Sequence, residues 1–343
     1  MSTQALIETA RQLVGAGKGL LAMDESNPTC NRRFAAVGIL QTEDARRAYR
    51  ELLITTPDPG DSISGAILYD ETIRQRTRGG VPFVEVLTDA GIIPGIKVDT
   101  GAQDLAGRPG EKLTEGLDDL RSRLKDYAER GARFAKWRAV ITLGEGIPSR
   151  GCIEANAQAL ARYAALCQEA AVVPIIEPEV LMAGDHTLER CREVTEETMH
   201  SVFNHLFTQN VMLEGVILKV NMVLPGLSCP RQESVEAVSA ATVQTLLRGV
   251  PAAVPGIAFL SGGQSPALAS ARLNAMNLIA RSPTSRVPWP LAFSYARAIQ
   301  QPVLEIWQGK AANVAAAQDA LGHRARCNHA ALRGEYSAAM ERA

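Results

Sequence analysis

The stretch Gly215-Val-Ile-Leu-Lys219-Val-Asn-Met-Val223 places one lysine inside a run of aliphatic and β-branched residues. An apolar run of this length is typical of a strand that is buried on both faces, as in a parallel sheet. Because lysine is seldom buried completely, Lys219 in such a strand needs an explanation. One interpretation is that its amine reaches solvent along its own methylene groups. The other is a chemical role, because a desolvated lysine has a lowered pKa and its free amine attacks ketones and aldehydes.

Similar strand-like runs recur along the chain and alternate with helix-like segments. Polar groups at the carboxyl ends of the later runs stand at positions 97, 136, 177, 219, 261 and 297, at intervals of 39, 41, 42, 42 and 36 residues. Parallel strands need crossover helices, so this alternation indicates a parallel sheet. Eight such units predict the α/β class and a (β/α)8 barrel. An open doubly wound sheet is the alternative, but the Gly-x-Gly-x-x-Gly turn of nucleotide-binding folds is missing after the first strand.

The pattern also gives the expected extent of the elements. We expect one barrel domain over residues 1–343, in which 311–343 form an alanine-rich helical tail. The helices are predicted, before that tail, at 3–14, 42–53, 113–129, 153–170, 188–208, 235–247 and 267–279.

Composition excludes several classes of protein. The 343 residues carry 36 Lys and Arg against 37 Asp and Glu, with no long block of one sign, which disfavours binding to nucleic acid or to a membrane surface. The N-terminus lacks a signal-peptide pattern and no apolar run approaches the roughly 18 residues of a membrane span, so we expect a cytoplasmic protein. The six cysteines lack Cys-x-x-Cys spacing and the five histidines do not cluster. The sequence therefore predicts reduced thiols and gives no sign of a metal site.

Functional side chains in (β/α)8 barrels gather at the carboxyl ends of the strands. Because alternate residues of a strand face the same side, the pairs at 136 and 138, 177 and 179, and 219 and 221 are each expected to point two groups into the barrel mouth. One such pair alone could be the solvated start of a loop. Several successive strands that end this way favour a site.

This set of residues suits carbonyl chemistry. Lys219 is the expected Schiff-base nucleophile, with a pKa lowered by burial and by the charge of Lys136, and such a Schiff base stabilises a carbanion on the neighbouring carbon. Glu177 and Glu179 are expected to repel each other, which raises the pKa of one of them for acid–base work near neutral pH. Asp24 is expected to accept or orient a hydroxyl proton of the substrate.

A phosphate site is expected beside them. Ser261-Gly262-Gly263 follows a strand-like run and exposes backbone amides. Phosphate sites after strands seven and eight are frequent in barrels, and Arg297 at the end of the eighth adds a bidentate donor.

With these residues in place, the chain resembles the class I, Schiff-base fructose-bisphosphate aldolases along almost its whole length. The stretches that carry the resemblance are Leu21–Ser26, Ser64–Leu68, Gly95–Asp99, Phe134–Arg138, Pro174–Glu179, Leu218–Val223, Phe259–Gln264, Ser294–Arg297 and Trp307–Lys310. The stretches Ser26–Cys30 and Tyr69–Thr72 look closest to plastid and bacterial members.

The resemblance implies metal-free, cofactor-free and reversible cleavage of a sugar phosphate, fructose 1,6-bisphosphate, by a homotetramer. It implies that Lys219 forms the Schiff base and that Glu177 is the principal proton-transfer acid. Asp24, Lys136 and Glu179 would assist proton transfer and dehydration of the carbinolamine. It further implies that Arg33, Lys97 and Arg138, with Ser26 nearby, surround the distal phosphate and the sugar hydroxyls. It also implies that the other phosphate is bound by Ser261, Gly262, Gly263, Ser294 and Arg297.

The chain departs from the family pattern at several positions. Ala296 stands where the family usually has glycine, and the tail contains one tyrosine, Tyr336, where many members end in a mobile tyrosine that helps protonate the enamine. The alternatives are a related Schiff-base lyase for another sugar phosphate, such as sedoheptulose 1,7-bisphosphate, and a non-catalytic barrel that binds a partner. A metal-dependent aldolase is disfavoured by the scattered histidines. Bacterial cytoplasm and plastid stroma both stay open.

Overall fold

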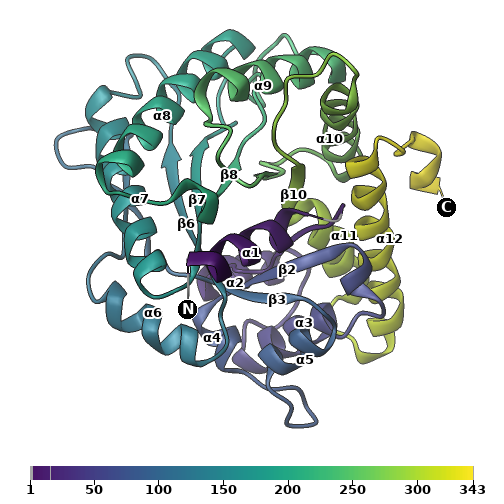
Figure 1. Ribbon diagram of the computed structural model, residues 1–343. Coiled ribbons are helices and arrows are strands. Elements are labelled where there is room, and N and C mark those ends of the chain that lie inside the picture. The colour runs from purple at the N-terminus through teal and green to yellow at the C-terminus, as the bar shows by residue number, and fades with distance from the viewer. Residues whose placement is uncertain (1–2, 16, 343) are drawn as a thin grey trace.

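Eight parallel strands close into a barrel in the computed structural model, which describes residues 3–15 and 17–342 (Figure 1). Around the barrel the strand order is β1-β10-β9-β8-β7-β6-β3-β2. Their bounds are β1 Gly19–Ala22, β2 Ile63–Leu68, β3 Ile93–Lys97, β6 Phe134–Ile141, β7 Val173–Val180, β8 Ile217–Val220, β9 Ile257–Phe259 and β10 Leu291–Tyr295. The predicted (β/α)8 barrel is confirmed.

Helices surround this barrel on its outside (Figure 1). The α-helices are α1 Thr3–Val14, α2 Asn27–Ala36, α3 Glu43–Ile54, α4 Asp70–Arg74, α5 Phe83–Asp89, α6 Leu120–Glu129, α7 Arg150–Glu169, α8 Leu188–Thr208, α9 Val235–Gly249, α10 Pro266–Arg281, α11 Arg297–Trp307 and α12 Val314–Arg333. Short 3₁₀ helices are η1 Pro59–Asp61, η2 Leu213–Gly215, η3 Ala311–Asn313 and η4 Ala338–Arg342. Within the described part of the chain, no helix is long and apolar enough to cross a membrane.

Hydroxyl side chains start several of these helices. Ser149, Thr187, Ser234 and Ser265 each stand at the N-cap of a long helix and accept a hydrogen bond from the amide three residues on. Each bond satisfies one of the amides that a helix N-terminus leaves without an intrahelical partner, a contribution of about 1 kcal/mol.

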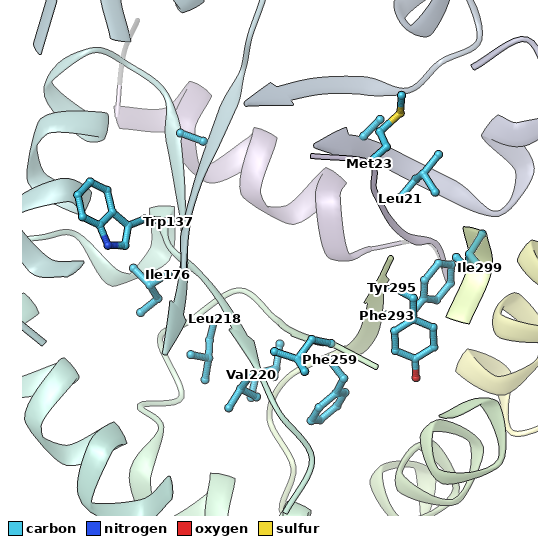
Figure 2. Packing of buried hydrophobic residues seen from close by; sticks show 14 of the residues in the cluster. Leu21, Met23, Trp137, Ile176, Leu218, Val220, Phe259, Phe293, Tyr295 and Ile299 are labelled. Carbon is cyan, nitrogen blue, oxygen red and sulfur yellow. The ribbon is translucent and has the colours of Figure 1, made fainter. Parts of the chain in front are cut away.

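The barrel interior and the layer outside it form separate apolar clusters. Leu13 and Val14 of α1 pack into the amino-terminal end of the barrel, with Ile175 and Ile217 among the inward strand residues. The outer cluster lies between the strands and the helices, where Figure 2 shows Trp137, Ile176, Leu218 and Phe259. Helix α1 therefore closes one end of the barrel and leaves the carboxyl end for the site.

The structure differs from the sequence prediction between residues 101 and 120. The predicted helix at 113–129 begins only at Leu120, because Lys112–Glu115 form strand β5, paired antiparallel with β4, Gly101–Asp104. Gly116 follows β5 with φ +125°, and a β-carbon there would lie 2.8 Å from Thr100 N. That left-handed backbone ends the strand and prevents a helix from running through it.

Other segments also differ from the prediction. Helices α2, α4, α5 and α11 were not predicted. The predicted helical tail is confirmed: it consists mainly of α12, which is capped by Gly334 in a left-handed conformation and is followed by η4. The predicted bounds at residues 1, 2 and 343 lie outside the described residues.

Candidate active site

The inward-facing row of several strands changes from apolar to charged along the strand. On β7, Val173 and Ile175 belong to the barrel-interior cluster, while Glu177 and Glu179 line a cavity at the carboxyl end. Strand β6 repeats the pattern, with Phe134 inside and Lys136 in the cavity. The apolar part fixes the register of the strand, and that register aims the charged side chains into the mouth.

The cavity has a volume of about 650 Å³. Its lining includes almost every predicted site residue, namely Asp24, Ser26, Arg33, Lys97, Lys136, Arg138, Glu177, Glu179, Lys219, Ser261, Gly262, Ser294 and Arg297. Of the residues predicted to bind the substrate, Gly263 does not line the cavity, although it lies beside Arg297.

Two lysines and two carboxylates form the centre of this cavity. Lys219 Nζ lies 3.0 Å from Glu177 Oε1. Lys136 Nζ lies 3.3 Å from Glu177 Oε2 and 2.8 Å from Asp24 Oδ2. Glu177 thus bridges the two amines. Each of the four residues exposes at most 9% of its surface to solvent.

Opposite charges at this centre shift the pKa values of Lys136 and Asp24. Burial lowers the pKa of Lys136, but the carboxylates of Asp24, Glu177 and Asp99 outweigh burial and raise that pKa above its ordinary value. Burial likewise raises the pKa of Asp24, and the nearby amines of Lys136 and Lys219 more than reverse this, leaving it well below its usual range. The two carboxylates on either side of Lys136 therefore favour its protonated form.

The prediction that mutual repulsion raises a glutamate pKa is wrong for Glu177. Burial does raise it, but the charges of Lys219, Lys136 and Arg138 outweigh burial, and the pKa of Glu177 lies below its ordinary value. The two glutamates have separate cationic partners, because Glu179 accepts a short charged hydrogen bond from Arg138 Nε.

Basic side chains form one wall of the cavity. Arg33 on α2 is ion-paired with Glu25, and Lys97 Nζ lies 2.7 Å from Asp99 Oδ1. Ser26 stands at the N-cap of α2, and its hydroxyl donates to Thr29 Oγ1 at 3.2 Å. With Arg138, this wall offers several cationic and hydroxyl donors to an anion.

The turn after β9 forms a second wall of the cavity. Gly262 and Gly263 have φ +57° and +102°, and the hydrogen bonds of the described residues leave both amides unused. Ser294 Oγ is buried and has no hydrogen-bond partner among the described residues. Burial lowers the pKa of Arg297, and the charges of Arg33 and Arg138 lower it further. Unused donors and mutually repelling guanidinium groups suit an anion such as phosphate.

Two acidic residues of the site were not predicted as site residues. Asp99 Oδ2 accepts the backbone N–H of Arg138 at 3.2 Å and lies 3.9 Å from Lys136 Nζ. Its i, i+2 spacing from Lys97 was the available signal. Glu25 is held by Arg50 and Gln300 as well as Arg33. Because these partners are remote in sequence, no local pattern could have revealed its role.

Asn221 does not lie in the mouth, contrary to the prediction from alternation. Its side chain accepts from Val180 N at 2.9 Å and donates to Met222 O and to Thr195 on α8. Strand β8 ends at Val220, so the alternation that places Lys219 inward no longer holds two residues later. Among the described residues, no group of three or more His, Cys, Asp or Glu side chains is arranged to hold a metal ion.

The family model described as "Fructose-bisphosphate aldolase class-I" matches residues 5–343. The chain belongs to this family. A probable class 1 fructose-bisphosphate aldolase of Xanthomonas campestris pv. campestris is 57% identical over 337 residues, covering 98% of this chain and 99% of the relative. Chloroplastic fructose-bisphosphate aldolase 3 of Arabidopsis thaliana is 51% identical over 336 residues, covering 98% of this chain and 84% of the relative. These matches confirm the class I aldolase family that the sequence motifs indicated.

A solved aldolase structure agrees with the barrel. Fructose-bisphosphate aldolase from Plasmodium falciparum, determined in complex with TRAP and a small-molecule inhibitor, superposes with a TM-score of 0.94 at 46% identity. The match covers 97% of this chain and 95% of that one.

Proposed function

We propose that this protein is a class I fructose-bisphosphate aldolase, a carbon–carbon lyase that reversibly cleaves fructose 1,6-bisphosphate to dihydroxyacetone phosphate and glyceraldehyde 3-phosphate. The observation that carries the proposal is the buried contact of 3.0 Å between Lys219 and Glu177 inside a cavity with basic walls. It rests also on family membership across residues 5–343.

The first step forms the covalent intermediate. Glu177 accepts a proton from the Lys219 ammonium, and the free amine adds to the ketone carbon to give a carbinolamine. Glu177 then returns the proton to the carbinolamine oxygen, water leaves, and a protonated Schiff base remains. The geometry favours this route because one carboxylate oxygen faces the reacting amine while the other faces Lys136.

The second step breaks the carbon–carbon bond. A carboxylate removes the proton of the C4 hydroxyl, the C3–C4 bonding electrons move towards the Schiff-base nitrogen, and the aldehyde leaves. The resulting enamine is protonated at C3, and water then hydrolyses the Schiff base to release the ketone phosphate and restore Lys219. We assign the proton transfers to Glu177, and Asp24, whose carboxylate lies 2.8 Å from Lys136 Nζ, would orient the hydroxyl.

The two walls account for a substrate with phosphate at both ends. Ser261, Gly262, Ser294 and Arg297 would hold the phosphate next to the ketone, with Gly263 supplying an amide at the edge. Arg33, Lys97 and Arg138, with Ser26, would hold the distal phosphate and the sugar hydroxyls, while Glu179 fixes Arg138. Fixing both ends places the ketone carbon at Lys219 and supplies much of the orientation that the reaction needs.

Further properties are part of the same proposal. We take residues 1–343 as one domain that assembles into a homotetramer and works in the cytoplasm. The chain is similar to both chloroplastic and cytosolic aldolases of Arabidopsis thaliana. Neither a cofactor nor a metal ion enters the proposed reaction, and neither nucleic acid nor membrane is a proposed partner.

The test is a cleavage assay coupled to consumption of the ketone phosphate, run with excess chelator. Fructose 1,6-bisphosphate should be cleaved, and Lys219→Met should abolish turnover while the thermal unfolding midpoint stays close to that of the parent protein. Sedoheptulose 1,7-bisphosphate is assayed in parallel. A higher kcat/KM for that sugar would move the proposal to the related lyase. Absence of cleavage with every ketose phosphate would favour the non-catalytic barrel.

A further inference from the structure

Met182 lies directly against the backbone of Ser261-Gly262-Gly263, the turn proposed to bind phosphate and called the phosphate turn below. A β-carbon added to Gly262 would lie 1.8 Å from Met182 Cε and 2.6 Å from Met182 Sδ, so the thioether occupies the side-chain space of that glycine. Met182 is 4% exposed, and it does not line the cavity. It therefore supports the turn from behind and does not face a ligand.

The segment that carries Met182 is itself fixed. Met182 comes two residues after β7, the strand of Glu177 and Glu179, and its carbonyl accepts from Leu227 N at 2.8 Å. Further hydrogen bonds join Ser228 N to Gly184 O and Gly226 N to His186 O, at 2.9 and 2.8 Å. The loops after β7 and β8 are thus bonded to each other, which leaves Met182 little freedom to move.

Polar contacts hold the two ends of the phosphate turn. Gln264 Nε2 donates to Ser261 O at 3.0 Å, and Arg272 on α10 donates to Gln264 Oε1 at 2.8 Å. Gly262 and Gly263 lie between Ser261 and Gln264 in the sequence, and no hydrogen bond within the described residues uses their amides. Two successive glycines have more backbone freedom than any other pair, so contacts from outside must set their conformation.

We propose that Met182 is a positioning residue that sets the place of the Gly262 amide and thereby the affinity for the phosphate monoester next to the reacting ketone. The inference rests on the proposed function of this turn as a phosphate site. It goes beyond that function by linking the strand of the acid–base glutamates to the phosphate turn through one apolar side chain. Removal of the thioether leaves a gap beneath the turn, and the amides then spend less time in the binding arrangement.

The kinetic test uses a series of shorter side chains, Met182→Leu, Met182→Val and Met182→Ala. Fructose 1-phosphate and fructose 1,6-bisphosphate share the phosphate next to the ketone, so Met182→Ala should raise KM for both by a similar factor, roughly tenfold, with kcat within about threefold. Met182→Leu conserves volume and should stay within about twofold of the parent protein. Met182→Val should fall between them, and it carries the test if the alanine variant does not fold.

Met199→Ala on α8 is the matched control, because Met199 is also buried and does not line the cavity. It should lower the unfolding midpoint without changing KM. A defect of Met182→Ala no larger than that of Met199→Ala would overturn the proposal. So would a fall in kcat with unchanged KM.

Direct binding separates this proposal from the proposed function. Calorimetric titration with glycerol 3-phosphate reports phosphate-monoester affinity whether or not the protein cleaves sugars. Weaker binding by Met182→Ala than by the parent protein and Met199→Ala supports the positioning role even if no cleavage is found. Equal affinity of all three, with cleavage intact, contradicts the role of Met182 and leaves the aldolase proposal standing.

Discussion

Lys219 Nζ and Glu177 Oε1 lie 3.0 Å apart on the neighbouring strands β8 and β7, and both residues are almost wholly buried. A buried lysine whose nearest charged partner is a carboxylate has a built-in acceptor for the proton that it must lose before it attacks a ketone. Because the same carboxylate also contacts Lys136, its charge is stabilised from two sides.

Replacement of Glu177 by glutamine should slow catalysis without removing the nucleophile. The amide keeps the shape but can no longer accept and return a proton, so kcat should fall by roughly 10²- to 10⁴-fold while KM changes little. Steady-state kinetics give both constants, and Glu154→Gln on the surface of α7 is the control. A kcat within threefold of the parent value would assign the proton transfer to another group.

Replacement of Lys136 by methionine should destabilise the protein by an amount that depends on pH. In the folded parent protein the pKa values of Asp24 and Glu177 are depressed. Their ion pairs therefore stabilise the protein fully above about pH 4, the pKa of these carboxyl groups in the unfolded chain. This stabilisation is lost as the pH falls through the lower pKa values of the folded state. Without Lys136, burial is less opposed and the pKa of Asp24 should rise. The variant should therefore lose about 3–5 kcal/mol of unfolding free energy at pH 8.

That penalty should shrink as pH falls towards about 4.5, because the buried carboxyl groups of the variant, with raised pKa values, become protonated while those of the parent protein stay ionised. Urea unfolding at the two pH values measures it. Lys112→Met serves as control, because the Lys112 side chain is 39% exposed and pairs with an exposed aspartate. It should shift stability by no more than about 0.5 kcal/mol. A penalty that is equal at both pH values, or larger at the lower one, contradicts the charge arrangement.

Replacement of Arg33 by methionine should discriminate between the two phosphates of the substrate. A lost charged hydrogen bond costs about 1.5–3 kcal/mol, which corresponds to a rise in KM of roughly 10- to 150-fold for fructose 1,6-bisphosphate. Fructose 1-phosphate lacks the distal phosphate, so its KM should change less than threefold. Arg297→Met should raise KM for both substrates. Equal effects of Arg33→Met on the KM values of both sugars would argue against the assignment of the two phosphates to the two walls.

Replacement of Tyr336 by phenylalanine should leave turnover unchanged. The Tyr336 hydroxyl bonds to Glu341 Oε1 at 2.9 Å and to Ala267 O at 3.3 Å, and Tyr336 is not among the residues that line the cavity. Loss of these bonds should cost about 0.5–1.5 kcal/mol of stability. A tenfold fall in kcat would instead show that Tyr336 takes part in protonation of the enamine.

The fold and the central charges could be predicted because they follow from local alternation. On β7, the same period that buries Val173 and Ile175 places Glu177 and Glu179 in the mouth. The regular spacing of the strands then indicates that such ends converge. Alternation fails where a strand stops, and for this reason Asn221 was predicted in the mouth although it bonds to Thr195 on α8.

The electrostatics and the supports of the site could not be predicted, because they depend on residues from distant segments. The pKa of Glu177 is lowered by cations from two other strands, whereas its nearest acidic neighbour in sequence suggested the opposite shift. Glu25 meets Arg50 and Gln300 only after the barrel closes. Met182 is adjacent to Gly262 in space but 80 positions away in sequence.

The most direct test of the account is borohydride trapping with fructose 1,6-bisphosphate and excess chelator, read by intact and peptide mass. The Schiff-base mechanism predicts one reduced sugar-phosphate adduct per chain, on the peptide that contains Lys219. It predicts no adduct on the Lys219→Met variant. Folded protein that turns over the sugar but carries no adduct, or carries it on another lysine, would contradict the Schiff-base mechanism assigned to Lys219.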